Sequence, residues 1–156
     1  SDVYVLDEYA RLLFNRAYLT QEHDHWEQTI QAYRRVLIDP QKAALGVDAL
    51  RESAAFLAHA YTQNQDFATA ELTLGLLSAF QAEYWLVNYL QACLYTAMFQ
   101  ASQHQPWLDR ALQALATGLE QSPERVREEA LHDPDLQALR EYRKKDFNRL
   151  LKENTP

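Results

Sequence analysis

The sequence is poor in the residues that interrupt or crosslink regular structure. Its 156 residues include 3 glycines, 5 prolines and a single cysteine, Cys93. One cysteine excludes an internal disulfide and a multi-cysteine zinc ribbon. Scarce glycine and proline disfavour the many turns of a β-sandwich or β-barrel. No Gly-rich phosphate loop, GxSxG or HExxH is present, so the sequence lacks the signatures of nucleotide binding, serine hydrolysis and zinc hydrolysis.

Long apolar runs and an excess of positive charge are also missing. The sequence contains no run of about 18 apolar residues, so it predicts no transmembrane segment. The first residues lack the basic start and apolar core of a signal peptide. Together with the single free cysteine, this predicts a cytoplasmic location. The net charge of −7 argues against broad nucleic-acid binding. We therefore expect no nucleic-acid partner, no cofactor and no bound metal.

The abundant residues are alanine, leucine and glutamine, which favour helix. Apolar residues recur at three-, four- and seven-residue steps along almost the whole chain, which predicts amphipathic helices. The expected helices cover residues 3–20, 25–38, 48–64, 67–80, 83–102, 106–121, 124–131 and 135–152. Because no linker separates them, we expect one all-α domain over 1–156.

The second helix of each pair repeats a phrase of large and small residues at steps of 41 residues. Its four positions hold Trp26, Phe67 and Leu108, then Thr29, Ala70 and Ala111, then Tyr33, Leu74 and Leu115, and finally Val36, Leu77 and Gly118. A small residue lets antiparallel helices approach closely, and the large residues fill the grooves. In the first helices Ala17 matches Ala58, and in the third pair we expect the small residue at Ala92, about seven residues earlier.

These residues resemble the tetratricopeptide repeat family. The matches are Leu57, Ala58, Tyr61, Phe67, Ala70, Leu74 and Leu77 in the second unit, and Ala92, Tyr95, Leu108, Ala111, Leu115 and Pro123 in the third. The first unit departs from the family at Arg16 and Thr29. Residues 130–140, which read ALHDPDLQALR, and then Phe147, resemble the segment that often closes bacterial arrays of this type.

The resemblance implies a right-handed stack of helical hairpins, a TPR-like α-solenoid. Its repeats would cover 3–40, 48–80 and 83–122, with a C-terminal helical cap over 124–152. Stacked hairpins curve, and the first helix of each pair lines the concave side. The candidate groove residues, placed by this register, are Arg11, Phe14, Tyr18, Glu52, Ala55, His59, Thr62, Gln63, Tyr89, Cys93 and Thr96.

The resemblance implies a non-catalytic scaffold or adaptor that binds a protein or peptide in this groove. In that interpretation Arg11 and His59 meet a carboxylate of the partner. One alternative is a regulatory or self-associating domain of a larger multidomain protein or enzyme, and a homodimer is another. We expect no catalytic residues.

Three polar features have structural alternatives. The cluster Glu22-His23-Asp24-His25 contains metal-ligating residue types, but consecutive residues in a turn rarely face one ion, so a solvated turn is the alternative. His59 is either a partner contact or a packed histidine with one hydrogen bond. Cys93 has no evident electropositive setting to activate it, and its alternative is a small buried hydrophobe.

Positive charge gathers near the C-terminus. Residues 140–152 hold six Lys or Arg against two acidic residues. The candidate basic surface consists of Arg140, Arg143, Lys144, Lys145 and Arg149. Such a surface suits phosphates or an anionic lipid surface. The alternative is the solvated face of a capping helix, whose cations complement the helix C-terminus.

Overall fold

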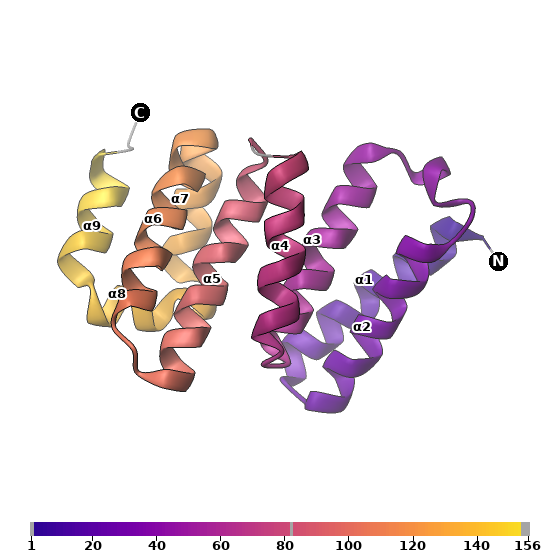
Figure 1. Cartoon of the computed structure of the whole chain (residues 1–156), viewed down its shortest axis with the longest axis horizontal. Helices are drawn as coiled ribbons and strands as arrows, with labels where there is room; N and C mark the ends of the chain where they lie inside the picture. The colour runs from indigo at the N-terminus through magenta and orange to yellow at the C-terminus, as the bar shows by residue number, and fades with distance from the viewer. Residues whose placement is uncertain (1, 82, 154–156) are drawn as a thin grey trace. The chain divides into compact units, whose positions relative to one another are not determined.

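The computed structural model describes residues 2–81 and 83–153, and all regular structure in these ranges is helical (Figure 1). Consecutive helices pack as antiparallel pairs. The α-helices are α1 Val3–Thr20, α2 His23–Ile38, α3 Val47–Gln63, α4 Phe67–Phe80, α5 Trp85–Ser102, α6 Pro106–Gln121, α7 Pro123–His132, α8 Gln137–Tyr142 and α9 Lys144–Glu153; η1 Lys42–Leu45 and η2 Pro134–Leu136 are short 3-10 helices. The predicted all-α class is confirmed.

Local chemistry explains where several helices begin and end. Asp2 caps α1, because its carboxylate accepts a hydrogen bond from the Tyr4 N–H at 2.8 Å. Asp39, which precedes a proline, has extended backbone and ends α2. Pro106 and Pro123 occupy the first positions of α6 and α7, where a missing N–H costs nothing.

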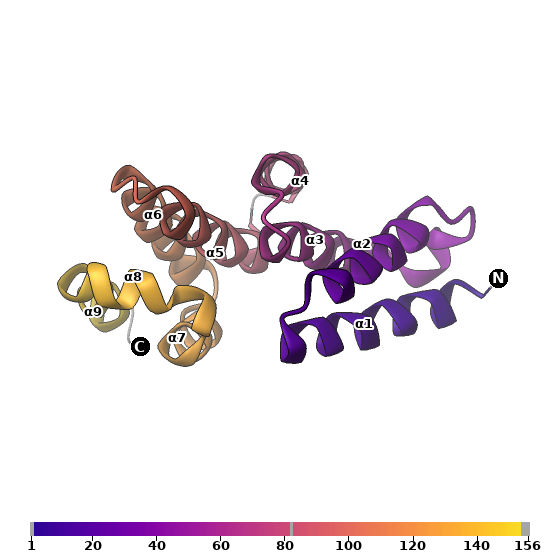
Figure 2. The ribbon, with the colours of Figure 1, turned by 90° about the horizontal axis from the view of Figure 1, so that it is seen from below.

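The chain divides into two compact units, one ending at Thr73 and the other beginning at Leu74, so the boundary falls within α4. In the first unit, α1 and α2 form an antiparallel pair, and α3 packs mainly on α2 (Figure 2). The buried residues that form its core come from all three helices. They are Ala10, Leu13, Ala17, Trp26, Ile30, Ala32, Tyr33, Val36, Leu57 and Ala60.

In the second unit, α5 and α6 form the most extensively packed pair. The C-terminal segment then returns across both helices. Its α7 and α9 pack on α6, η2 packs on α5, and α8 contacts both. The buried apolar side chains of this segment are Val126, Ala130, Leu136, Ala138, Leu139, Phe147 and Leu151. The tail is therefore an integral part of the core of this unit.

The large–small phrase found in the sequence is buried in α2 and α6 and partly buried in α4. Trp26, Thr29, Tyr33 and Val36 are buried in α2. Ala70 and Leu74 are fully buried in α4, and the corresponding α6 residues are Leu108, Ala111, Leu115 and Gly118. Phe67 and Leu77, the other two positions of the phrase in α4, are half-buried, so the phrase is fully packed only in α2 and α6.

The α1–α2 and α5–α6 turns have the same construction. Gln21 and Gln103, 82 residues apart, both have φ 57° and ψ 22°, and each backbone N–H donates to the carbonyl four residues earlier at 2.7 Å. Each Gln side chain also donates to the carbonyl three residues earlier, and the preceding Thr20 or Ser102 hydroxyl donates to the carbonyl four residues earlier. The two hairpins thus share a detailed hydrogen-bonding pattern.

This shared turn fixes the register of the first helices of these two pairs. Aligned at Gln21 and Gln103, the counterpart of Ala17 is Phe99, whose carbonyl accepts the equivalent bond, and Ala92 is the counterpart of Ala10. Ala92, which is fully buried, therefore lies seven residues further from its turn than Ala17 does, the offset expected from the sequence.

The prediction of a single C-terminal helix over 135–152 is wrong. The chain forms the three short helices η2, α8 and α9 there. Arg143 leaves helical geometry, with φ −126° and ψ 42°, and its guanidinium pairs with Asp109 of α6 at 2.7 Å. The buried Leu139 and Phe147 lie eight residues apart, a spacing that an uninterrupted helix also keeps on one side. Periodicity alone therefore could not reveal the break.

We predict that Gln65→Gly stabilises the protein. Gln65 has φ 62° between α3 and α4, a backbone region that costs an L-residue about 1–2 kcal/mol and costs glycine little. Its side chain is exposed. Urea denaturation should show a gain of roughly 0.5–1 kcal/mol in the free energy of unfolding, and Gln65→Ala should show no gain. Equal stability of the two variants would contradict the explanation.

Candidate functional site

The first unit carries a half-buried strip of aromatic, amide and charged side chains where α1 meets α3. We call it the α1–α3 strip. Its members are Arg11, Phe14 and Tyr18 on α1, and Glu52, Phe56, His59 and Gln63 on α3. Six of these seven residues were predicted to line a groove, and the structure brings those six together.

Phe14 holds the strip to the core beneath it. Its ring centroid lies 5.0 Å from that of Phe56, 6.0 Å from that of His59 and 6.3 Å from that of Tyr18. It also meets the buried Trp26 edge-on at 5.4 Å. Such aromatic pairs contribute about 0.5–1.5 kcal/mol each beyond area burial. The aromatic part of the strip is therefore held by the core.

A charged network closes one end of the strip. The carboxylate of Asp7 accepts hydrogen bonds from Arg11 Nε at 3.1 Å and from Ser53 Oγ at 2.7 Å. The Arg11 guanidinium also lies 3.7 Å from Glu52. Burial alone would lower the pKa of Arg11, but Asp7 and Glu52 raise it above its ordinary value. The structure thus pairs Arg11 with carboxylates of the chain itself.

The other end of the strip holds a histidine and an amide. His59 is buried, and its Nε2 lies 3.3 Å from the side-chain nitrogen of Gln63. Thr62, another predicted groove residue, is buried, and its hydroxyl donates to the Ala58 carbonyl at 3.3 Å. Ala55 is fully buried as well. Thr62 and Ala55 therefore lie below the accessible part of the strip.

The predicted groove residues of α5 lie beneath the C-terminal segment. Tyr89, Cys93 and Thr96 are all buried. The Tyr89 hydroxyl donates to the carboxylate of Asp133 at 2.5 Å, and the Thr96 hydroxyl donates to the Ala92 carbonyl at 2.8 Å. Burial, reinforced by Cys93 and Asp133, raises the pKa of Tyr89 far above its ordinary value. In this unit the chain's own tail covers the face predicted to bind a partner.

Cys93, Asp133 and Asp135 bring their ligand atoms within 4.8 Å of one another, the one such group found among the described residues. The Asp133 carboxylate already accepts hydrogen bonds from the Asp135 N–H at 2.9 Å and from the Tyr89 hydroxyl. Burial first, and then the two aspartates, raise the pKa of the Cys93 thiol well above its ordinary value. A protonated thiol is a poor metal ligand. The Asp133 carboxylate, for its part, serves as the N-cap of η2.

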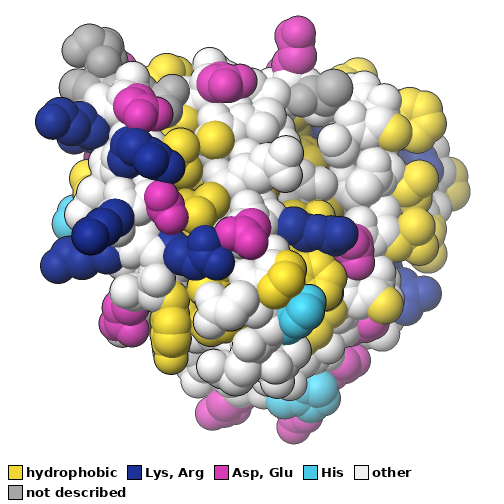
Figure 3. Space-filling model, turned by 60° about the vertical axis from the view of Figure 1, so that its left-hand side comes forward, with side chains coloured by type: hydrophobic (Ala, Val, Ile, Leu, Met, Phe, Trp, Pro, Cys, Tyr) yellow, Lys and Arg dark blue, Asp and Glu magenta, His cyan; other side chains and the backbone are white. Residues whose placement is uncertain are grey.

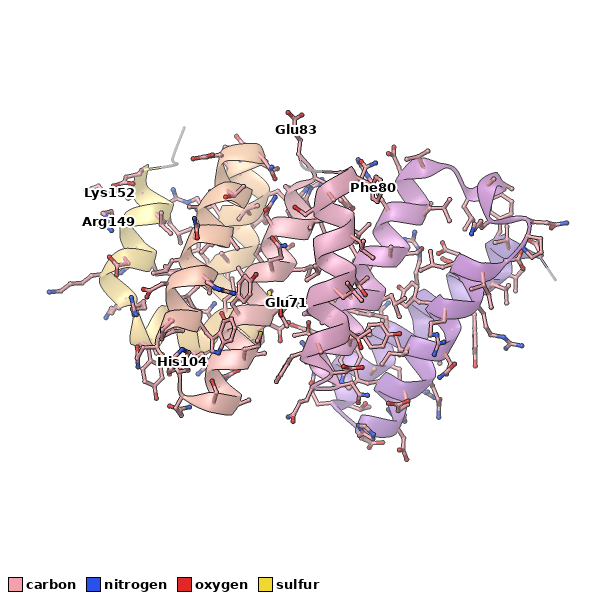
Figure 4. The ribbon with its side chains drawn as sticks, viewed as in Figure 1. Glu71, Phe80, Glu83, His104, Arg149 and Lys152 are labelled. Carbon is pink, nitrogen blue, oxygen red and sulfur yellow. The ribbon has the colours of Figure 1, made fainter. Side chains whose placement is uncertain are left out.

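Several side chains of the candidate basic surface already bond to other groups of the chain. Arg140 donates to the Ala130 and Asp133 carbonyls at 2.8 and 2.7 Å, and Arg143 pairs with Asp109. Lys144 and Lys145 are exposed. On α9, Arg149 pairs with Asp146 at 3.0 Å, although it and Lys152 extend outward (Figure 4).

Figure 3 views this side of the molecule and shows acidic side chains interspersed among the Lys and Arg side chains. A surface of alternating sign attracts phosphate less than a continuous basic patch does.

The Glu22–His25 cluster starts a helix. His23 is the first residue of α2, and Asp24 lies in its first turn. His25 Nδ1 lies 2.7 Å from Thr20 Oγ1, and its Nε2 lies 3.4 Å from Glu22. The group therefore joins the end of α1 to the start of α2.

Sequence reasoning missed Asp7, Ser53, Phe56 and Asp133. Asp7 did carry a signal, because it shares the packed side of α1 with Val3 and Ala10 at steps of four and three residues. A carboxylate on such a face needs a buried partner. Asp133 carried none, since its contact with Tyr89 joins residues 44 positions apart.

Comparisons with protein-family models, with curated proteins and with solved structures found no match to this chain. Among the described residues, no helix is both long enough and apolar enough to cross a membrane.

We predict that Asp7→Ala lowers the free energy of unfolding by about 2–3 kcal/mol, because it leaves Arg11 and the buried Ser53 hydroxyl without their shared acceptor. Ser53→Ala, which removes one neutral donor, should cost only about 1 kcal/mol. Chemical denaturation of the two single variants and the double variant measures the coupling. A loss below about 0.5 kcal/mol for Asp7→Ala would contradict the network.

We predict that stability falls as pH rises above about 8.5, the ordinary pKa of a cysteine. The folded state holds the Cys93 thiol protonated, because its pKa is raised, whereas the unfolded chain releases that proton. The stabilisation is thus fully present at neutral pH and is lost in alkali. Urea midpoints between pH 7.5 and 9.5 should fall for the natural chain and less steeply for Cys93→Ala. Equal slopes would contradict the assignment.

Proposed function

We propose that this protein is a non-catalytic interaction module that binds an extended or helical segment of another protein along the α1–α3 strip. The observation that carries the proposal is a cluster of half-buried aromatic rings from two helices. Phe14 contacts Tyr18 on its own helix α1 and Phe56 on α3, so the three rings form one surface. Aromatic side chains anchored by a core are the residue types enriched at binding hot spots.

The proposal includes a helical-repeat architecture of the tetratricopeptide type, with a right-handed stack of hairpins. The shared turns at Gln21 and Gln103 support a repeat. Grooves of about 330 and 280 Å³ also lie between the two helices of the first and third hairpins. Their second-helix residues correspond at the 82-residue step: Gln28 with Arg110, Gln31 with Gln113, Ala32 with Ala114 and Arg35 with Thr117.

The chemistry of the strip suggests what it would bind. Arg11 is already neutralised by Asp7 and Glu52, so a partner's carboxylate gains little there. The remaining accessible surface is aromatic and amide, with Tyr18 and Gln63 at its edges. We therefore propose a partner segment with an aromatic or aliphatic anchor for the rings and backbone groups that hydrogen-bond the amide.

The test is peptide selection followed by paired variants. A random peptide library is selected on the immobilised protein, and the affinity of a selected peptide is measured for Tyr18→Ala/Gln63→Ala. We expect at least about tenfold weaker binding, since the variant removes an aromatic anchor and an amide contact. The control is Tyr142→Ala/Gln137→Ala on α8, which also removes one tyrosine and one glutamine and should bind within about twofold.

Circular dichroism and thermal melting establish that both double variants are folded. NMR chemical-shift changes on peptide addition should cluster on α1 and α3. Equal binding by the two double variants, or changes confined to α8 and α9, would refute the proposed surface.

A further inference from the structure

The exposed side of α1 carries four large apolar residues, of which Tyr9 also lines the groove between α1 and α2. Val5, Tyr9, Leu12 and Leu19 are 64%, 53%, 65% and 85% exposed. Their spacing of three, four and seven residues puts them in one stripe along the helix. This stripe lies on a different side of α1 from Arg11, Phe14 and Tyr18, which face α3. Several large apolar side chains exposed along one side of a helix are the kind of surface that a partner helix covers.

The stripe is arranged symmetrically about Leu12. Val5 lies seven residues before Leu12, and Leu19 lies seven residues after it. Charged residues also flank it symmetrically, because Glu8 lies four residues before and Arg16 four residues after. Both are exposed, and neither has an ion-pair partner in the described part of the chain. The Arg16 guanidinium donates a hydrogen bond to the side chain of Gln28.

We propose that this stripe binds the same stripe of a second copy, with the two α1 helices antiparallel and Leu12 at the two-fold axis. In that arrangement Val5 of each copy meets Leu19 of the other, and Glu8 lies level with Arg16 of the other. A two-fold contact uses one self-complementary patch on both copies. The pairing goes beyond the proposed peptide-binding role and does not depend on it.

The charges select the antiparallel orientation. A parallel pairing in register would put Glu8 beside Glu8 and Arg16 beside Arg16, which is repulsive at both ends. The antiparallel pairing makes two favourable contacts from the same four side chains. It also covers three leucine or valine side chains per copy, which burial stabilises in proportion to apolar area.

Charge reversal tests the pairing. Analytical ultracentrifugation of the full chain should show a dimer whose dissociation constant rises at least about tenfold in Glu8→Arg and in Arg16→Glu, because each change makes both cross-contacts repulsive. An equimolar mixture of these two variants should dimerise again, since every cross-contact then joins an acid to a base. The double variant Glu8→Arg/Arg16→Glu should also dimerise.

A matched leucine pair controls for nonspecific association. Leu12→Glu should make the protein monomeric, whereas Leu72→Glu on α4, at a leucine that is 64% exposed, should leave the dimer intact. A monomer at all concentrations, or a dimer that Leu72→Glu breaks and Leu12→Glu does not, would overturn the proposal. Failure to restore the dimer on mixing would overturn the antiparallel register. Peptide binding through the α1–α3 strip is measured separately, so either proposal can fail alone.

Discussion

Close packing of antiparallel helices around small residues is the constraint on which the rest of the structure depends. Ala10 and Ala17 in α1, Thr29 in α2 and Ala111 in α6 are fully buried, so neighbouring helices approach closely there. The large residues beside them, such as Trp26, then fill the remaining space. A hairpin built in this way buries one side of each helix and leaves others to be covered. The differences between the two units follow from how those other sides are covered.

The second unit covers the remaining side of α5 with its own tail. Leu136 and Leu139 are fully buried, and Asp133 joins η2 to α5 by accepting from Tyr89. The first unit instead brings α1 against α3 only along a narrow line, and Phe14 remains half-buried there. Helix faces at corresponding sequence positions therefore differ in accessibility, because the tail covers one of them and not the other. This is why Tyr89, Cys93 and Thr96 are buried although their register resembles that of the strip.

The sequence was sufficient to predict the fold class and most helix bounds. Periodicity and proline placement predicted 3–20, 67–80 and 106–121, which are the bounds of α1, α4 and α6. The sequence did not predict the backbone conformation of the turns. Gln21 and Gln103 adopt the left-handed region, which glycine usually occupies at a helix C-terminus and glutamine rarely does. The sequence also missed the break at Arg143, which accompanies an ion pair with a distant helix. For the candidate site, the register predicted six of the residues that line the strip on α1 and α3. It did not predict that Asp7 pairs with Arg11, because the sequence marked Asp7 only as a residue of the first helix.

The helix α1 combines three requirements in 18 residues. One side packs on α2 through Ala10 and Ala17, a second meets α3 through Phe14, and the third presents Leu12 outward. The exposed side of a surface helix is usually polar. Exposed apolar side chains such as Leu12 are in contact with water, and burial against another surface would stabilise them. Pairing of two copies through Leu12 would bury them without covering the second side. Each dimer would then present two α1–α3 strips, and a partner with two binding segments would be held more tightly by both than by either alone.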